Sequence, residues 1–256
     1  MEDIYFFIDE SGFDDKSSIL IASLVILDNP DFVRKQISEV KDNILHDPIL
    51  KIIPSSRSLK SAGFHYSEDH YEIKNKFIDF LSPLTFQAYI CFFDKKLYMS
   101  KLNNKSRLRI FNKIRMLLKE IAFYGIHYKK WYRELIRKLL FDRIRDHKDR
   151  QLHFIFEQND IETKKGVSII IRSIIDNINK KDKVKLIAKP SINFSDKSDD
   201  CLSLSDYVCC IFKAHYENLS KSNNMERRNF ERIRGKIRVI HNLLTDEFYT
   251  RRNPFP

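Results

Sequence analysis

The sequence predicts an α/β protein with a mixed five-stranded sheet flanked by helices. Five short apolar runs, rich in β-branched and aromatic residues, predict buried strands. They lie at residues 4–8, 18–27, 86–93, 152–156 and 184–188. The segment between the first two runs is short and rich in turn residues, so we expect an antiparallel hairpin. We expect the first and fourth strands to run parallel, joined by a right-handed crossover.

Helical periodicity fills most of the chain between these runs. The pattern predicts helices at 32–45, from about 67 to 81, twice between 106 and 145, and at 167–178, 202–219 and 225–244. With no internal repeat and no long linker, we expect one domain over residues 1–220. It includes a helical insertion at about 106–147, and a basic helical C-terminal extension follows at 221–256.

The charge of the chain indicates an acidic partner. Lysine and arginine number 46 against 35 aspartate and glutamate residues, a net charge of +11. This balance favours nucleic acid or an anionic membrane surface, although biased genome composition is an alternative explanation. The candidate contacts to a nucleic-acid backbone are Arg107, Arg109, Arg115, Arg227, Arg228 and Arg232. The alternative for these arginines is an ordinary solvated surface.

Cysteine usage indicates a reducing compartment. The four cysteines are Cys91, Cys201, Cys209 and Cys210, and their spacing fits neither a disulfide framework nor a paired zinc motif. No secretory signal pattern opens the chain, and no apolar run approaches the roughly 18 residues that span a bilayer. We therefore expect a cytoplasmic protein that does not enter a membrane. The 5 glycines form no phosphate-binding loop.

Acidic residues stand where two predicted strands end. The first strand runs directly into Asp9 and Glu10, before Ser11 and Gly12, and the fourth ends at Glu157. Carboxyl ends of parallel neighbours share one edge of a sheet, so these acids are expected side by side. A third acid, Asp206, lies in a mostly apolar helix that could cross that edge. The alternatives are a turn cap for Asp9 and a polar helix face for Asp206.

Converging carboxylates repel one another, and a divalent cation relieves that repulsion. Ligands that offer only oxygen suit Mg²⁺ or Mn²⁺ rather than zinc. Two such ions about 4 Å apart activate water and stabilise the leaving oxygen in phosphodiester cleavage. The hypothesis is therefore a metal site of Asp9, Glu10, Glu157 and Asp206, with Asp9, Glu157 and Asp206 catalytic and Glu10 on the opposite side of the pleat.

Three further residues are candidates for supporting roles. His65 lies in a polar segment near Glu68, where a histidine beside carboxylates could move protons or order water. Lys60 could contact phosphate. The alternatives are capping or loop roles for His65 and Glu68, and a solvated side chain for Lys60.

Three blocks of the sequence together resemble the family known as domain of unknown function 3800. They are IDESG at 8–12, FHYSED at 64–69 and LSLSDYV at 202–208. The resemblance implies an RNase H-like sheet and a metal-dependent acidic site, with Asp9, Glu157 and Asp206 at the family's acidic positions. It also matches Ser58-Leu59-Lys60 to a Glu-x-Lys segment, so Glu10 or Glu68 would replace the missing glutamate. In the last block, Ser203 and Ser205 stand where glutamine and alanine are commoner.

These observations predict a metal-dependent nuclease or phosphodiesterase, a hydrolase acting on DNA or RNA. The alternative is a non-catalytic protein that binds nucleic acid or a protein partner and keeps a degenerate RNase H-like site. A protein partner or a homo-oligomer is compatible with either. By family analogy alone, a third possibility is an accessory role in a bacterial defence or mobile-element system.

Overall fold

The computed structural model describes residues 2–14, 16–104, 128–159, 161–182, 189–196, 199–220 and 225–256. In this part of the chain, one sheet of seven strands has the order β5-β4-β1-β2-β3-β6-β7. The strands are β1 (Asp3–Ser11), β2 (Ile19–Leu27), β3 (Gln87–Asp94), β4 (Gln151–Glu157), β5 (Ser191–Ser195), β6 (Ile237–Asn242) and β7 (Glu247–Tyr249).

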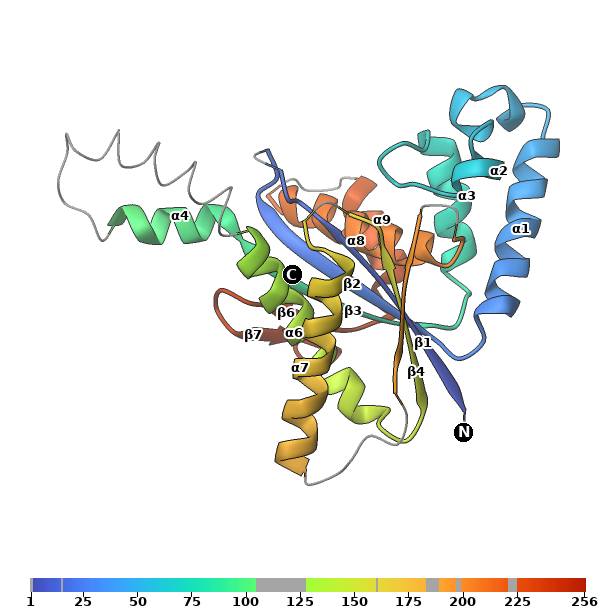
Figure 1. Ribbon diagram of the computed structural model, residues 1–256. Helices are drawn as coiled ribbons and strands as arrows, with labels where there is room; N and C mark the ends of the chain where they lie inside the picture. Colours follow the sequence, from blue (N-terminus) through green and yellow to red (C-terminus); the bar gives the residue numbers. More distant parts are fainter. Residues whose placement is uncertain are drawn as a thin grey trace.

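The helices connect and cover these strands (Figure 1). They are α1 (Pro30–His46), α2 (Leu59–Ala62), α3 (Tyr71–Leu81), α4 (Lys95–Asn104), α6 (Tyr128–Asp146), α7 (Lys164–Asp182), α8 (Leu202–Glu217) and α9 (Met225–Arg234). Two short 3₁₀ turns, η1 (Leu50–Ile52) and η2 (Pro54–Ser56), lie between α1 and α2. None of the helices in the described residues is long and apolar enough to span a membrane.

The expected fold class is confirmed. β1 pairs antiparallel with β2 and parallel with β4, so it lies inside the sheet. β2 and β3 pair antiparallel, and β4 and β5 pair parallel. The order β5-β4-β1-β2-β3, with only β2 reversed, is the RNase H-like arrangement expected from the resemblance. The apolar residues of β2 and of the middle of β1, mostly β-branched or aromatic, explain why these strands are buried on both faces there.

The predicted count of five strands and the wholly helical C-terminal extension are wrong. α9 ends at Arg234, immediately before Gly235, and the chain then forms β6 and β7. β6 pairs parallel with β3, and β7 pairs antiparallel with β6. The β-branched residues Ile237, Val239 and Ile240 favour a strand over the predicted continuation of the helix to residue 244. Intervening basic and polar residues obscured this pattern in the sequence.

The fifth strand also differs from expectation. The predicted run at 184–188 lies outside the described residues. The strand beside β4 is formed by Ser191–Ser195, whose side chains are only partly buried. It lies at the sheet edge, where half the backbone hydrogen bonds face outward, and this position needs little apolar surface.

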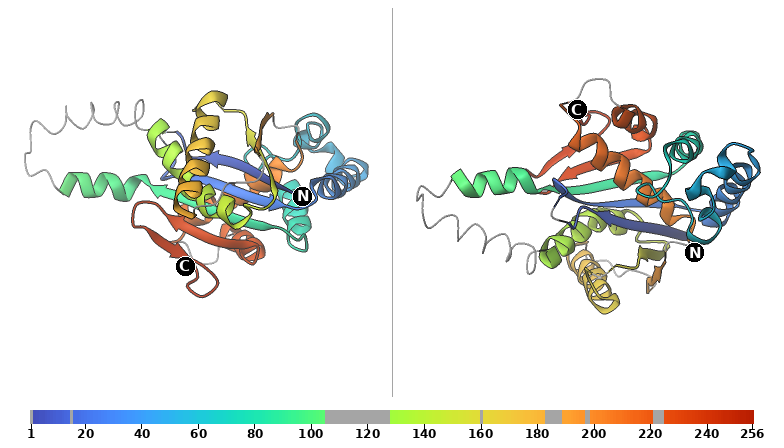
Figure 2. Two further views of the ribbon diagram at one scale, coloured as in Figure 1. Left: turned by 60° about the horizontal axis from the view of Figure 1, so that its bottom comes forward. Right: turned by 90° about the horizontal axis from the view of Figure 1, so that it is seen from above.

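Helices cover both faces of the sheet (Figure 2). α6 and α7 pack on one face, over a core that includes Phe6, Ile8 and Phe154. α8 packs on the other face against β1 and β2, and its core includes Phe7 and residues of α1, α3 and α9. Successive residues of β1 therefore point into different cores. The same alternation sets the face of the sheet to which each acid at the end of β1 points.

The β1–β2 turn depends on a glycine. Gly12 has a φ of +84°, and a Cβ there would lie 1.9 Å from the Ile19 carbonyl oxygen. The left-handed backbone and the close approach both require glycine. The buried Lys95 closes the turn from the start of α4, because its Nζ donates to the Gly12 carbonyl at 2.8 Å and the Asp14 carbonyl at 2.6 Å. The turn thus fixes the hairpin directly after Asp9 and Glu10.

Candidate functional site

Asp9 and Glu157 lie side by side at the ends of two parallel strands. Ile8 is opposite Phe156 in the β1–β4 register, so the next residue of each strand carries the acid. Phe7 and Ile155, two residues before the acids, both point into the core beneath α8. Because side chains alternate along a strand, Asp9 and Glu157 point to this same face. The Glu157 carboxyl therefore lies within hydrogen-bonding reach of Asp9 and helps to raise the pKa of Asp9.

Glu10 starts from the opposite side of the pleat, as the alternation predicts. Ile8, two residues earlier, belongs to the core beneath α6 and α7. Asn159 follows β4 and donates its amide to Glu10 Oε1. Glu10 Oε2 is buried and has no hydrogen-bond partner among the described residues. The carboxyl therefore keeps one buried oxygen with unused acceptor capacity.

Asp206 reaches the same edge from α8. The hydroxyl of Ser23 on β2 donates to the Ser205 carbonyl at 2.8 Å, which ties the helix to the sheet one residue before Asp206. Ser23 is opposite Asp9 in the β1–β2 register. This bond therefore places Asp206 over Asp9, and the two carboxylates interact electrostatically.

A buried loop before α3 holds Asp206 in place. The Tyr66 backbone N–H donates to Asp206 Oδ2 at 2.8 Å, and His65 Nδ1 lies 3.7 Å from the same oxygen. Asp69 fixes this loop, because its Oδ2 accepts from the His65 N–H at 2.9 Å and from the Tyr207 hydroxyl at 2.5 Å. Desolvation raises the pKa of Asp69 to about 6, and the bond from Tyr207 opposes the shift. The loop and α8 thus form one hydrogen-bonded unit.

Burial and crowding make the acids hard to ionise. Burial is the main cause that raises the pKa of Asp9 well above its usual range, and Asp206, Glu157 and Glu10 add repulsion. Burial, with repulsion from Glu157, raises the pKa of Glu10 to about 8. Burial also raises the pKa of Asp206, although the Tyr66 N–H and His65 oppose the shift. The cluster therefore binds protons at a pH where isolated carboxyls are ionised.

The acids line one cleft of about 410 Å³. Its walls come from the ends of β1 and β4, the loop before α3, α3 itself and one side of α8. The lining residues are Asp9, Glu10, Ser11, Tyr66, Ser67, Lys74, Glu157, Asp206, Cys210, Lys213, Ala214 and Glu217. All four acids proposed from the sequence are among them.

The cleft offers the ligand chemistry of a hard cation, but no preformed cage. Among the described residues, no group of three or more His, Cys, Asp and Glu side chains is placed to enclose a metal ion. The four acids offer only oxygen ligands, which suit Mg²⁺ or Mn²⁺. A cation would satisfy the unpartnered Glu10 Oε2 and relieve the repulsion of Asp9 by Asp206, Glu157 and Glu10. The residues present therefore fit such an ion.

The three residues predicted to support the site, His65, Lys60 and Glu68, do not line the cleft. His65 is buried behind Asp206, with its Nε2 3.0 Å from the Ala62 carbonyl oxygen, and it does not line the cleft. Lys60 on α2 and Glu68 before α3 are exposed and also lie outside the lining.

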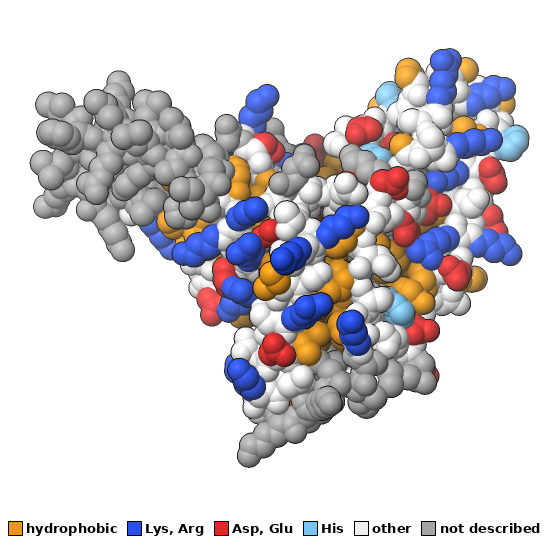
Figure 3. Space-filling model, viewed as in Figure 1, with side chains coloured by type: hydrophobic (Ala, Val, Ile, Leu, Met, Phe, Trp, Pro, Cys, Tyr) orange, Lys and Arg blue, Asp and Glu red, His pale blue; other side chains and the backbone are white. Residues whose placement is uncertain are grey.

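The predicted arginines are divided between described and undescribed segments. Arg107, Arg109 and Arg115 lie outside the described residues. Arg227 and Arg228 are exposed on α9, and Arg232 forms an ion pair with Asp79 of α3. In Figure 3, lysine and arginine side chains are spread among acidic and apolar ones over the face that carries α6 and α7. Among the described residues of that face, acidic and apolar side chains separate the basic ones.

Several residues of the cleft were missed by sequence reasoning. Asn159 and the backbone of Tyr66 contact the acids, and Lys74 and Lys213 line the same walls. For Lys213 a signal existed, because it follows Asp206 by seven residues and so lies on the same side of the helix. For Asn159 and Lys74 the contacts depend on the tertiary fold.

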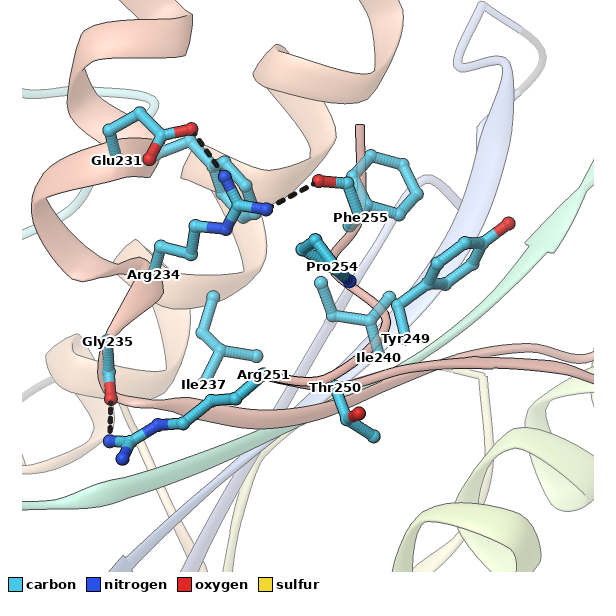
Figure 4. Close-up of a pocket in the computed structure, with 11 residues that line it drawn as sticks. Glu231, Arg234, Gly235, Ile237, Ile240, Tyr249, Thr250, Arg251, Pro254 and Phe255 are labelled. Atoms are coloured by element: carbon cyan, nitrogen blue, oxygen red, sulfur yellow. Dashed lines mark hydrogen bonds and ion pairs between the residues drawn. The ribbon is translucent and has the colours of Figure 1, made fainter.

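A second cavity, of about 420 Å³, lies between α9 and the C-terminal strands (Figure 4). Its floor is apolar, with Ile237, Ile240 and Phe255. Its charged groups already have partners: Arg234 bonds Glu231 and the Phe255 carbonyl, and Arg251 bonds the Gly235 carbonyl. It holds no group of carboxylates, so the acidic cleft is the candidate active site.

The fold is RNase H-like, and comparison with known proteins adds a distant structural similarity. No family model matches the sequence, and no curated protein matches it. Among solved structures, the chain is similar to the crystal structure of the ribonuclease H2 from Pyrococcus horikoshii OT3. The two share 11% sequence identity with a TM-score of 0.46, over 89% of this chain and 84% of that one. Function is therefore inferred from the residues of the cleft.

Proposed function

We propose that the protein is a metal-dependent nuclease or phosphodiesterase that hydrolyses DNA or RNA in the acidic cleft. The observation that carries this proposal is the convergence of Asp9, Glu10, Glu157 and Asp206 on one cleft from three separate segments. Burying four acids together is costly for folding, because each desolvated carboxylate repels the others. Proteins rarely keep such a destabilising cluster unless it has a function. Carboxyls in a cleft whose pKa values are shifted are therefore candidates for a functional site.

In this proposal Asp9, Glu157 and Asp206 hold Mg²⁺ or Mn²⁺, and Glu10 supports them. When bound, the cation would supply a more acidic water and neutralise charge on the phosphodiester. Binding of the cation would favour the ionised form of Asp9, and the Tyr66 N–H keeps Asp206 oriented towards the cleft. His65 lies behind Asp206, with its Nδ1 3.7 Å from Asp206 Oδ2, and opposes the rise in the pKa of Asp206. These contacts position the acids before the substrate arrives.

The resemblance of the IDESG, FHYSED and LSLSDYV blocks to the domain of unknown function 3800 supports this proposal, and membership of that family is itself proposed. So is the division into a domain at 1–220, with its insertion at 106–147, and an extension at 221–256. A cytoplasmic location is proposed from four cysteines that are all free. Roles for Lys60 and Glu68, and for the arginines as nucleic-acid contacts, remain proposals.

The test is cleavage of labelled single-stranded and duplex DNA and RNA by purified protein with Mg²⁺ or Mn²⁺. We expect products from at least one substrate, none with EDTA, and none from Asp9→Asn or Asp206→Asn proteins that remain folded. Asp176→Asn, at an exposed position on α7, is the matched control and should cleave like the wild type. Cleavage that survives EDTA and both substitutions in the cleft would contradict the proposal.

The alternative is a binding protein with a degenerate site. It is favoured by one observation, the absence of a preformed metal cage among the described residues. This alternative predicts salt-sensitive binding of nucleic acid that is unaffected by EDTA and by Asp9→Asn. The same set of proteins and substrates separates the two functions.

A further inference from the structure

Two lysines, Lys74 and Lys213, also line the acidic cleft, and the proposed function gives them no role. One face of α8 lines the cleft with Asp206, Cys210, Lys213, Ala214 and Glu217. These positions recur every three or four residues, so they form one stripe along the helix. From Asp206 to Glu217 the stripe is about 16 Å long, at 1.5 Å per residue. The cleft therefore extends well beyond the carboxylates.

Lys213 occupies the middle of this stripe, about 10 Å along the helix from Asp206. Its Nζ lies 3.4 Å from the Ser11 hydroxyl at the end of β1. No carboxylate of the described residues lies within 4 Å of this ammonium group, and Glu217 on the next turn is already bonded to the Ser18 N–H and hydroxyl at 2.9 Å. Lys213 therefore presents a charge at the cleft without a close ion pair, although it also helps to lower the pKa of Asp14 in the β1–β2 turn.

Lys74 supplies a second cation from a different wall. It projects from α3, and its Nζ lies 4.5 Å from the centre of the Tyr66 ring. Contact with the ring face restrains the flexible lysine chain, so the ammonium is held at the cleft. Within the described part of the chain, Lys74 also lacks a carboxylate within 4 Å. Tyr66 is the residue whose N–H orients Asp206, so this cation stands beside the acid end of the cleft.

We propose that Lys74 and Lys213 form a phosphate clamp, which holds one nucleic-acid strand across the carboxylates by the phosphates that flank the bond to be cut. The inference rests on the proposed function and adds the residues that would bind its substrate. An ammonium group binds phosphate as a point charge and reads no base, so the clamp positions a strand without selecting its sequence. The separation of Lys213 from Asp206 along α8 means that it contacts a neighbouring phosphate rather than the one being cleaved.

The test is the salt dependence of binding. A fluorescein-labelled single-stranded oligonucleotide is titrated with protein at about 50 to 200 mM salt, with Ca²⁺ in place of Mg²⁺, and anisotropy gives Kd. Each phosphate contact contributes about 0.7 to 0.9 to the slope of log Kd against log salt. We expect Lys213→Gln and Lys74→Gln each to reduce the slope by that amount, and the double variant by about 1.4 to 1.8.

Two controls separate charge from folding. Lys76→Gln, at an exposed position two residues from Lys74 on α3, should leave the slope unchanged. Lys213→Arg keeps the charge and should keep the slope, while thermal unfolding shows that each variant is folded. Unchanged slopes in both glutamine variants, with a wild type that binds and cleaves, would overturn the clamp alone. A wild type that binds no nucleic acid would overturn both the clamp and the proposed function.

Discussion

The carboxyls of Asp9 and Glu157 lie within hydrogen-bonding reach of each other at the ends of two parallel strands. Burial is the main cause that raises the pKa of Asp9, and the neighbouring Asp206, Glu157 and Glu10 add to it. Asp9 therefore keeps a proton at a pH where an isolated aspartate is ionised. A proton and a cation compete for this edge of the sheet.

The first prediction concerns Asp206. Asp206→Asn keeps the size of the side chain and an acceptor for the Tyr66 N–H, but removes one charge from the cluster. We expect metal-dependent cleavage to fall by at least about 100-fold, the usual scale for losing a charge-stabilising group. The free energy of unfolding should stay the same or rise at neutral pH, since one repulsive charge is gone. Cleavage assays and urea unfolding measure the two effects.

A loss of activity that follows a loss of stability would contradict this account. The combination of intact folding and lost cleavage is the signature of a site whose charges serve chemistry rather than the fold.

The second prediction concerns pH. The folded state raises the pKa of Glu10 from 4.5 to about 8, so it binds this proton more tightly than the unfolded chain does. The resulting stability is fully present below pH 4.5 and is lost as the pH rises through 8. Without metal, the free energy of unfolding should therefore fall between these values. Each kcal/mol corresponds to about 2–4 °C in Tm.

Glu10→Gln should flatten this dependence and raise Tm at pH 8, because glutamine stays neutral. Thermal unfolding at a series of pH values in EDTA compares the two proteins. Parallel curves for wild type and variant would show that Glu10 is not the group responsible.

The third prediction concerns metal addition. A cation binds the deprotonated carboxylates, so it competes with the protons of the cluster. Mg²⁺ or Mn²⁺ should raise Tm of the wild type more at about pH 8 than at about pH 5, and binding should release protons. Calorimetry in buffers of different ionisation enthalpy measures that release. Asp9→Asn should abolish most of the Tm increase, whereas an increase of the same size in this variant would locate the metal elsewhere.

Much of the central fold was predictable, because its signals are local. β2 and the part of β1 from Ile4 to Ile8 are almost all apolar or aromatic, and the acids at the ends of β1 and β4 follow directly from where the apolar runs stop. The alternation of side chains along β1 is also enough to predict on which face of the sheet Glu10 lies. These features need only neighbouring residues in the chain.

The remaining features were missed because they arise from tertiary contacts. In β5, an edge strand, polar residues separate Ile192 from Phe194, and in β6 Arg238 and His241 interrupt the β-branched residues, so neither strand shows a long apolar run. The contact of Asn159 with Glu10 depends on the β1–β4 pairing. The placement of Lys74 depends on how α3 packs against the loop of Tyr66. The amino-acid pattern of a single helix or strand does not predict such contacts between distant parts of the chain.

The fourth prediction concerns the loop that holds Asp206. Tyr207→Phe removes the 2.5 Å hydrogen bond to Asp69 and leaves that buried acid with one fewer donor. We expect a cost of about 1–3 kcal/mol and weaker metal binding, since Asp69 also fixes the His65–Tyr66 backbone. Tyr216→Phe is the matched control on the same helix. It loses an equally short bond, to Asp94, which does not line the cleft.

Tyr216→Phe should lower stability by a similar amount and leave metal affinity unchanged. Urea unfolding and a Mn²⁺ titration of the two variants separate the effects. Equal metal affinities in both variants would mean that the Asp69 bond serves only the fold.

The fifth prediction concerns the turn that follows the acids. Gly12→Ala places a Cβ where the Ile19 carbonyl oxygen would be 1.9 Å away, at a φ of +84° that side chains disfavour. Strain of this kind costs about 1–3 kcal/mol, and relieving the clash must also move the hairpin. Gly235→Ala is the control, because a Cβ there meets nothing within 4 Å. We expect Gly12→Ala to lower the free energy of urea unfolding by at least that amount and Gly235→Ala to change it little. Equal stabilities would show that the β1–β2 turn, and with it the position of Asp9 and Glu10, tolerates a different backbone.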